Sequence, residues 1–121
     1  MKIKDKTVAI TGAASGIGEA LAISFYNANA KNIVVSDINT RSLEVVAKKI
    51  NATATTVDVT KEEDIKKMIS SYEYDIDIFC SNVGVGGYED FLKLTNEQWK
   101  KMIDTNLMSH IYGVRHVLPK M

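Results

Sequence analysis

The sequence predicts an α/β fold, in which helices cover both faces of a parallel β-sheet. Two observations carry this prediction. Short apolar segments alternate along the chain with amphipathic segments of helical period. The first apolar segment also runs into a turn with three glycines, and a helical segment begins at the end of that turn. Strands that are joined in this way by helical crossovers form parallel sheets with right-handed connections.

The composition is that of an ordinary globular domain. Hydrophobic residues make up 45% of the 121 positions, and 15 basic side chains balance 15 acidic ones, so nothing favours a nucleic-acid partner. No apolar run approaches the roughly 18 residues that span a membrane, and the first residues do not resemble a signal peptide. Cys80 is the only cysteine, which argues against a disulfide or a zinc cluster. We therefore expect a cytoplasmic protein without a membrane or nucleic-acid partner.

The first strand, residues 7–10, leads into the glycine turn. Gly12, Gly16 and Gly18 lack side chains where the backbone must turn tightly and approach a ligand. The helix that follows directs its free N–H groups and its positive dipole end at the turn, which suits a phosphate. Its predicted core-facing stripe is Ile17, Leu21, Phe25 and Ala28. A dinucleotide is the first ligand to consider, although the turn alone is equally compatible with a merely tight strand–helix connection.

The second and third units repeat this strand–helix pattern. A strand over residues 32–36 precedes a helix that Thr40 can cap, with an apolar stripe of Leu43, Val46, Ala47 and Ile50. A strand over residues 54–57 precedes a helix that begins with a capping box, residues 60–63. Both helices are amphipathic, so each is expected to cover one face of the sheet.

The fourth unit is longer. A strand over residues 75–81 runs into a loop, and the segment from Gly86 to Asp90 is a candidate for the mouth of a substrate site. A second capping box, residues 95–98, opens a long helix that we expect to reach about Leu118, where Pro119 closes it. Trp99 is expected in the core.

Acidic residues follow the second and third strands, at the sheet edge where ligands of open α/β sheets bind. Asp37 can accept hydrogen bonds from the ribose hydroxyls of NAD and would repel the 2′-phosphate of NADP. The alternative is an ordinary loop aspartate, and Arg41 is near enough to accommodate a 2′-phosphate, whereas Ser15 in the turn offers no positive charge. Asp58 is a candidate neighbour of the adenine, with Val59 against the ring, or else a loop aspartate before a helix.

The fourth unit contains two asparagines, Asn82 and Asn106, that are candidates for the site. Asn82 and Gly84 follow the fourth strand, where a glycine lets the backbone approach a cofactor, although a plain turn explains them nearly as well. Asn106 falls on the apolar side of the long helix, between Ile103 and Leu107, and a buried amide must find partners. It either bonds to neighbouring backbone and bends the helix or orients a water molecule at a reactive centre.

The two histidines do not suggest a metal site. His110 and His116 are six residues apart and point to different faces of the helix. We therefore expect no metal ligands in this chain.

Together these residues resemble the short-chain dehydrogenase/reductase family, whose fold is a Rossmann-type doubly wound parallel sheet. The pattern Thr11-Gly12-x-x-x-Gly16-Ile17-Gly18 matches the family's cofactor motif, and Asp37 matches its NAD-selecting acid. The remaining matches are Asp58-Val59 to the adenine-contacting pair, Ser81-Asn82-Val83-Gly84 to an Asn-Asn-Ala-Gly motif with two replacements, and Asn106 to the structural and catalytic asparagine.

The resemblance implies a single NAD-binding domain over residues 1–121, with strand order 3-2-1-4. It implies Thr11, Gly12, Ser15, Gly16, Ile17, Gly18, Asp37, Asp58, Val59, Asn82 and Gly84 as cofactor contacts and Asn106 as a catalytic residue. The implied reaction is hydride transfer between NAD, less readily NADP, and an alcohol or ketone, in a homo-oligomer.

The resemblance covers only the first half of the family's pattern. The family's catalytic Ser and its Tyr-x-x-x-Lys pair lie beyond the long helix, and no Tyr of this chain has Lys four residues later. We therefore expect the 121-residue chain alone to be inactive and to self-associate through its uncovered apolar surface. Two alternatives are a non-catalytic NAD-binding or interaction module and one half of a split enzyme.

Overall fold

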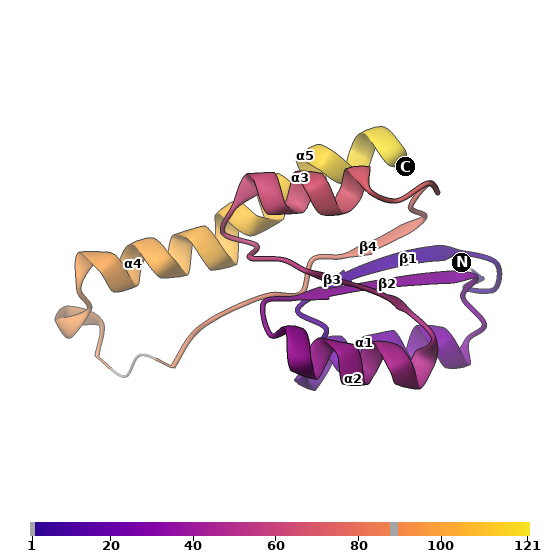
Figure 1. The fold of residues 1–121 in the computed structure, drawn as a ribbon. Helices are drawn as coiled ribbons and strands as arrows, with labels where there is room; N and C mark the ends of the chain where they lie inside the picture. Colours follow the sequence, from indigo (N-terminus) through magenta and orange to yellow (C-terminus); the bar gives the residue numbers. More distant parts are fainter. Residues whose placement is uncertain (1, 88–89) are drawn as a thin grey trace.

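The sheet has four parallel strands in the spatial order β3-β2-β1-β4 (Figure 1). The computed structural model describes residues 2–87 and 90–121. The strands are β1 (Thr7–Thr11), β2 (Asn32–Asp37), β3 (Thr53–Thr56) and β4 (Ile78–Cys80). The predicted fold class and strand order are confirmed. The fourth strand is shorter than the predicted 75–81, because only Ile78 to Cys80 pair with β1.

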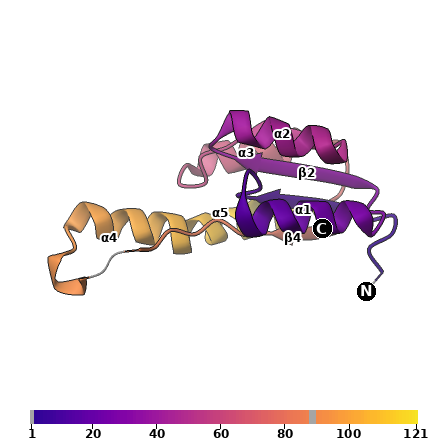
Figure 2. The same ribbon diagram turned by 90° about the horizontal axis from the view of Figure 1, so that it is seen from below.

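Helices lie on both faces of the sheet (Figures 1 and 2). One face carries α1 (Gly16–Asn27) and α2 (Thr40–Ile50), and the other carries α3 (Glu62–Ser70) and α5 (Ser109–Val117). The helix α4 (Asn96–Ile103) extends beyond the sheet, past the carboxyl ends of the strands. Short 3₁₀ turns, η1 (Phe91–Lys93) and η3 (Leu118–Lys120), flank the helices of this last unit.

Each face of the sheet has its own hydrophobic core, because successive side chains of a strand point to opposite faces. Val8 and Ile10 pack with the apolar side chains of α1 and α2. Ala9, between them, belongs to the second core, with Ile65 of α3 and Val117 of α5. In α1 the buried side is centred on Gly18 and Ala22, and Ile17 is 74% exposed, so the predicted placement of Ile17 in the core is wrong.

Two of the predicted helix starts are shifted. Asn39, not Thr40, caps α2, since its side chain accepts a hydrogen bond from the N–H of Ser42. The capping box at residues 60–63 does not form, because the hydroxyl of Thr60 donates to Asp58 instead. The capping box of α4 is confirmed, with Thr95 and Gln98 bonded reciprocally.

The predicted long helix is interrupted by a π-helical turn, η2 (Asp104–Met108), between α4 and α5. The turn rotates the helix, so that Thr105, Ser109, Gly113 and Val117 are buried while the predicted apolar side is exposed at Ile103 and Leu107. A Cβ on Gly113 would lie 2.6 Å from Cε1 of Phe79, so this helix packs on β4 at very close range. Trp99 is half-buried against Phe91, with ring centroids 5.0 Å apart, and is not a core residue.

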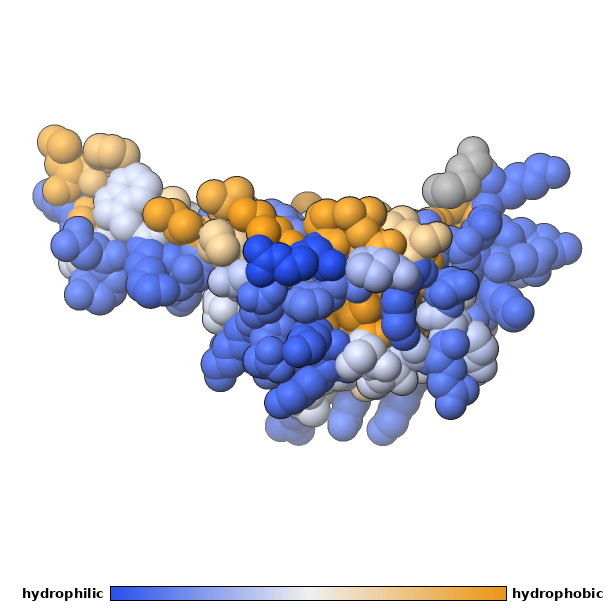
Figure 3. Space-filling model, turned by 90° about the horizontal axis from the view of Figure 1, so that it is seen from above, coloured by the Kyte–Doolittle hydropathy of each residue, from blue (hydrophilic) through white to orange (hydrophobic). Residues whose placement is uncertain are grey.

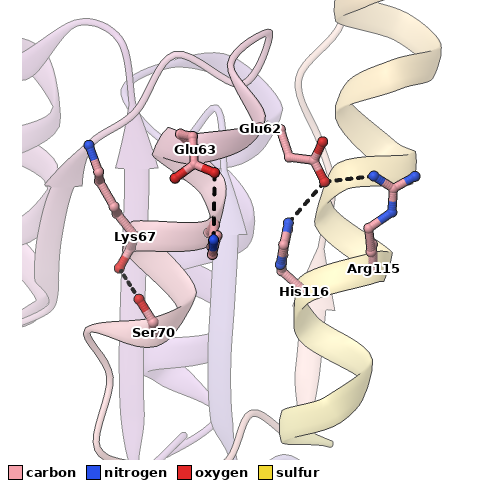
Figure 4. A network of polar contacts seen from close by, with 7 residues as sticks. Glu62, Glu63, Lys67, Ser70, Arg115 and His116 are labelled. Atoms are coloured by element: carbon pink, nitrogen blue, oxygen red, sulfur yellow. Dashed lines mark hydrogen bonds and ion pairs between the residues drawn. The ribbon is translucent and has the colours of Figure 1, made fainter.

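A polar network joins α3 to α5 at the surface (Figure 4). Glu62 Oε1 accepts a hydrogen bond from Nη1 of Arg115 at 2.7 Å and lies 3.1 Å from Nε2 of His116. Glu62 is in the first turn of α3, so the network fixes the start of that helix against the end of α5.

Candidate functional site

A cleft of about 570 Å³ lies at the carboxyl edge of the sheet. Its wall on the side of the sheet is made by the ends of β1, β2 and β3 and the segments that follow them, with Val83 and Val85 from the loop after β4. Its other wall is made by α4 and η2. The lining residues are Gly12, Asp37, Ile38, Val57, Asp58, Val59, Thr60, Val83, Val85, Glu97, Lys100, Lys101, Asp104 and Thr105. Both predicted acidic residues therefore face one cavity, together with Gly12 and Val59.

The glycine turn is built so tightly that two of its glycines have no room for a side chain. Gly12 has φ +68°, and a Cβ there would lie 2.9 Å from Cγ2 of Val83. A Cβ on Gly18 would lie 1.9 Å from the carbonyl oxygen of Gly12, so the first turn of α1 rests directly on the turn. At Gly16 the space is open and only the positive φ of +57° favours glycine.

Asp37 connects the end of β2 to the glycine turn. Its Oδ2 accepts a hydrogen bond from the N–H of Ala14 at 3.0 Å, and its Oδ1 accepts one from the N–H of Asn39 at 2.9 Å. Each carboxylate oxygen can accept a further bond, so the residue can both hold the turn and bind hydroxyl groups from the cleft. Ile38 lines the cleft beside it, whereas Arg41 does not.

Asp58 lines the part of the cleft that follows β3. Its Oδ1 accepts the hydroxyl of Thr60 at 2.7 Å and the N–H of Thr60 at 3.1 Å. These bonds, the hydroxyl first, lower the pKa of Asp58 against the opposing effect of burial, with Lys61 as a weaker favourable charge. The carboxylate is thus held ionised at neutral pH and keeps Val59 and Thr60 fixed along the cleft.

Asn82 supports the glycine turn from β4. Its backbone N–H donates to Oγ1 of Thr11 at 3.1 Å, and its side-chain Nδ2 donates to the carbonyl oxygen of Gly12 at 3.3 Å. The hydroxyl of Thr11 in turn donates to the carbonyl oxygen of Cys80 at 3.4 Å. Thr11 and Asn82 do not line the cleft, and they act on its geometry through the backbone of the turn.

Asn106 lies in the π-helical turn, and its side chain forms two hydrogen bonds with the loop after β4. Its Oδ1 accepts the N–H of Val85 and its Nδ2 donates to the carbonyl oxygen of Val85, both at 2.8 Å. The side chain is exposed, so the prediction of a buried amide is wrong, although the predicted bonding to backbone beside an irregular helix is present. At Gly84 a Cβ would meet Asn106 Oδ1 at an ordinary 3.5 Å, so packing alone does not require glycine there.

The other predicted contacts surround the cleft without lining it. Ser15, Gly16 and Ile17 are exposed around the start of α1. Gly86, Gly87 and Asp90 do not line the cleft, and Tyr88 and Glu89 of the predicted substrate mouth lie outside the described residues.

Sequence reasoning missed the wall that α4 and η2 contribute. Lys100 and Lys101 of α4 and Thr105 of η2 line the cleft because this part of the helix lies beside the carboxyl edge of the sheet. Of these three residues, only Thr105 could have been found from the sequence, because it is the neighbour of Asn106. Lys100 forms an ion pair with Asp104, one turn further along.

The structure shows neither a metal site nor a membrane span in the part of the chain that it describes. Within residues 2–87 and 90–121, no group of three or more His, Cys, Asp or Glu side chains could hold a metal ion. In the same part of the chain, no helix combines the length and apolar character needed to cross a membrane. Burial raises the pKa of the Cys80 thiol, which is half-buried in β4.

The sequence matches the short chain dehydrogenase family over residues 6–121. It is 35% identical over 130 residues to the uncharacterized oxidoreductase YvrD of Bacillus subtilis (strain 168). This alignment covers 100% of this chain and 48% of that protein. It is 38% identical over 111 residues to an NAD-dependent glycerol dehydrogenase of Listeria innocua, covering 87% of this chain and 43% of that protein.

The fold also matches solved structures. A short-chain dehydrogenase/reductase from Burkholderia phymatum, crystallised in complex with NAD, superimposes with a TM-score of 0.92 at 21% identity, covering 100% of this chain and 46% of that one. The chain thus spans about half the length of the curated relatives that it matches.

Proposed function

The chain belongs to the short-chain dehydrogenase family, and we propose that its cleft binds the adenosine half of a nicotinamide dinucleotide. The observation that carries this proposal is the convergence of three groups on one cavity: a glycine turn without room for side chains, the carboxylate of Asp37 and the segment from Asp58 to Thr60. The cavity volume of about 570 Å³ is typical of small-molecule sites. We propose the whole of residues 1–121 as one cofactor-binding domain.

Each wall of the cleft has a role in this proposal. The turn and the start of α1, with Gly12, Ser15, Gly16, Ile17 and Gly18, bind the pyrophosphate through backbone N–H groups and the helix dipole. Asp37 binds the ribose hydroxyls. Val59 packs on the adenine beside Asp58. Thr11, Asn82 and Gly84 hold the turn and the neighbouring loop in the arrangement that binds.

The bound cofactor supplies a hydride acceptor or donor, so the proposed reaction interconverts an alcohol and a carbonyl compound. Within this chain we propose Asn106 as a residue that orients the reacting centre, because its side chain fixes the loop at Val85 from the irregular turn of the helix.

We propose NAD rather than NADP as the cofactor. The charge of Asp37 opposes a 2′-phosphate at the ribose, and Arg41, the cation nearest to Asp37 in the sequence, does not line the cleft. Lys100 and Lys101 line the opposite wall, on α4, and Lys100 is paired with Asp104. The name of the glycerol dehydrogenase relative, which is 38% identical, is consistent with this choice.

The test is a calorimetric titration of the protein and of Asp37→Asn with NAD and with NADP. The amide keeps an oxygen for the N–H of Ala14, loses the acceptor for the N–H of Asn39 and loses the charge. We therefore expect NAD affinity to fall by about tenfold and the preference over NADP to shrink. Asp75→Asn, at an exposed position before β4, is the matched control and should bind as the parent does. Unchanged affinities for both cofactors in Asp37→Asn would refute the role of Asp37.

An assay for dehydrogenase activity separates the alternatives. Binding of NAD without turnover supports a non-catalytic module, and turnover only after a second chain is added supports a split enzyme. Turnover by the 121 residues alone contradicts both alternatives.

A further inference from the structure

A hydrogen-bonded serine–histidine pair lies next to Asn82, the residue that contacts the glycine turn. Ser81 follows the last residue of β4, and its hydroxyl is hydrogen-bonded to Nδ1 of His110 on α5. Both side chains are half-buried. His110 also lines a groove that is largely apolar. Its other lining residues are Leu107 of η2 and Ile111, Val114 and Arg115 of α5. Among the described residues, Ser81 is the hydrogen-bond partner of this imidazole.

The segment after β4 is held from the helix at two points. Ser81 is bonded to His110, and Val85 is bonded to Asn106. Asn106 and His110 are one helical turn apart and lie on the same side of the helix. The segment and the helix therefore run antiparallel, with one polar contact at each end of residues 81–85.

One residue between these two contacts, Asn82, contacts the glycine turn. Asn82, next to Ser81, bonds to Thr11 and to the carbonyl oxygen of Gly12. A Cβ on Gly18 would lie 2.8 Å from Nδ2 of Asn82, so the amide is enclosed between the turn and the first residues of α1. A displacement of the backbone at Ser81 is thus transmitted directly to the turn.

We propose that His110 is a positioning residue of the dinucleotide site, acting through Ser81 and Asn82 on the glycine turn. The proposal rests on the proposed function. His110 does not line the cleft, so its effect on binding comes from holding the turn in the conformation that receives the pyrophosphate. A turn that is already ordered binds more tightly, because less conformational freedom is lost on binding.

The first experiment is a double-mutant cycle in NAD affinity with Ser81→Ala, His110→Leu and the double variant. Each single variant removes the same hydrogen bond and is expected to weaken NAD binding by about fivefold. The double variant is expected to bind no more weakly than the weaker single variant, because the shared bond is already absent. Single variants that bind as the parent does, or effects that simply multiply, would overturn the proposal.

Two variants separate positioning from general damage to α5. His110→Asn keeps a hydrogen-bonding atom where Nδ1 lies and is expected to restore most of the affinity. His116→Leu is the matched control, since it makes the same substitution on the same helix, away from Ser81, and should leave the affinity unchanged. Failure of His110→Asn to bind better than His110→Leu argues against the proposal.

Hydrogen exchange keeps this inference separate from the proposed function. In His110→Leu, exchange should accelerate at the amides of Ala13, Ala14 and Asn82 and stay unchanged in α2. This holds whether or not the protein binds NAD, so a parent that binds no NAD refutes the proposed function while exchange still decides the role of His110. Unchanged exchange at the turn, or equal acceleration throughout α2, contradicts the inference.

Discussion

Asp37 faces the cleft and also holds the glycine turn in place. Its two oxygens already accept the N–H groups of Ala14 and Asn39, so the carboxylate fixes the glycine turn against the end of β2 before any ligand arrives. Replacing it with alanine would leave these N–H groups without their acceptor and change the shape of the turn as well as its charge. For this reason the asparagine variant tests ribose binding more cleanly than the alanine variant does.

Two glycines of the turn, Gly16 and Gly18, should differ sharply in their tolerance of alanine. Gly18→Ala puts a Cβ 1.9 Å from backbone at Gly12, so we expect a loss of about 3 kcal/mol or more in the free energy of unfolding. Gly16→Ala meets no atom within 4 Å and costs about 1 kcal/mol for its positive φ. Gly86→Ala, with open space and no positive φ, is the control and should change stability by less than about 0.5 kcal/mol. Urea unfolding of the three variants measures this order, and a Gly18→Ala protein as stable as Gly86→Ala would contradict the packing described here.

Single residues at the strand ends could be predicted from the sequence. Gly12, Asp37, Asp58 and Val59 line the cleft because the carboxyl ends of parallel strands meet at one edge of the sheet. Lys100 and Lys101 could not be predicted, since their place in the cleft depends on where α4 lies relative to that edge. The bond between Ser81 and His110 joins residues 29 positions apart and leaves no local pattern.

At the scale of elements, the strands were easier to predict than the helix ends. Buried, largely apolar runs define β1 and β2, whereas helix starts depend on which of several neighbouring side chains caps them. Asn39 prevails over Thr40, and Thr60 bonds to Asp58 instead of capping α3. The π-helical turn could not be predicted, because the apolar residues from Met102 to Val114 are compatible with a regular helix. The contact of Asn106 with Val85 joins residues 21 positions apart and leaves no local pattern.

The link between α3 and α5 should depend on pH. The hydrogen bond from Arg115, followed by that from His116, lowers the pKa of Glu62 below its usual range. A carboxyl group with a lowered pKa in the folded state stabilises the fold above its unfolded pKa, about 4.3 for Glu, and this contribution disappears as the pH falls through the folded value. Glu62→Gln should therefore be less stable than the parent at pH 7, and the two should converge below about pH 4.

Urea unfolding at several pH values measures this difference. Glu63→Gln, on the next residue of α3, is the matched control, because its ion pair with Lys66 lies on an exposed helix face. A Glu62→Gln deficit that persists unchanged to pH 3 would show that the charge of Glu62 is not the source of the stability.

At the scale of the whole molecule, an apolar band runs along one side of η1, α4, η2 and α5 (Figure 3). Its exposed members include Phe91, Leu92, Ile103, Leu107, Ile111, Val114 and Leu118. In the described part of the chain, β4 is also an edge strand without a neighbour on one side. Both features favour association with another apolar surface.

We therefore predict that the 121-residue chain self-associates. Sedimentation velocity should give a weight-average sedimentation coefficient that rises with concentration. Introducing charge into the band, as in Leu107→Lys combined with Ile111→Lys, should reduce that rise. Lys48→Glu, on exposed α2 at the other face, is the control. A monodisperse monomer at all concentrations would contradict the prediction.

We propose that the cleft at the carboxyl edge binds a nicotinamide dinucleotide. The most direct measurement is a map of amide chemical shifts of the isotope-labelled protein during titration with NAD. We predict saturable shifts at Gly12, Gly16, Asp37 and Val59, with those of α2 beyond its first turn nearly unchanged. No shifts at millimolar NAD, or shifts confined to the apolar band on α5, would contradict the account.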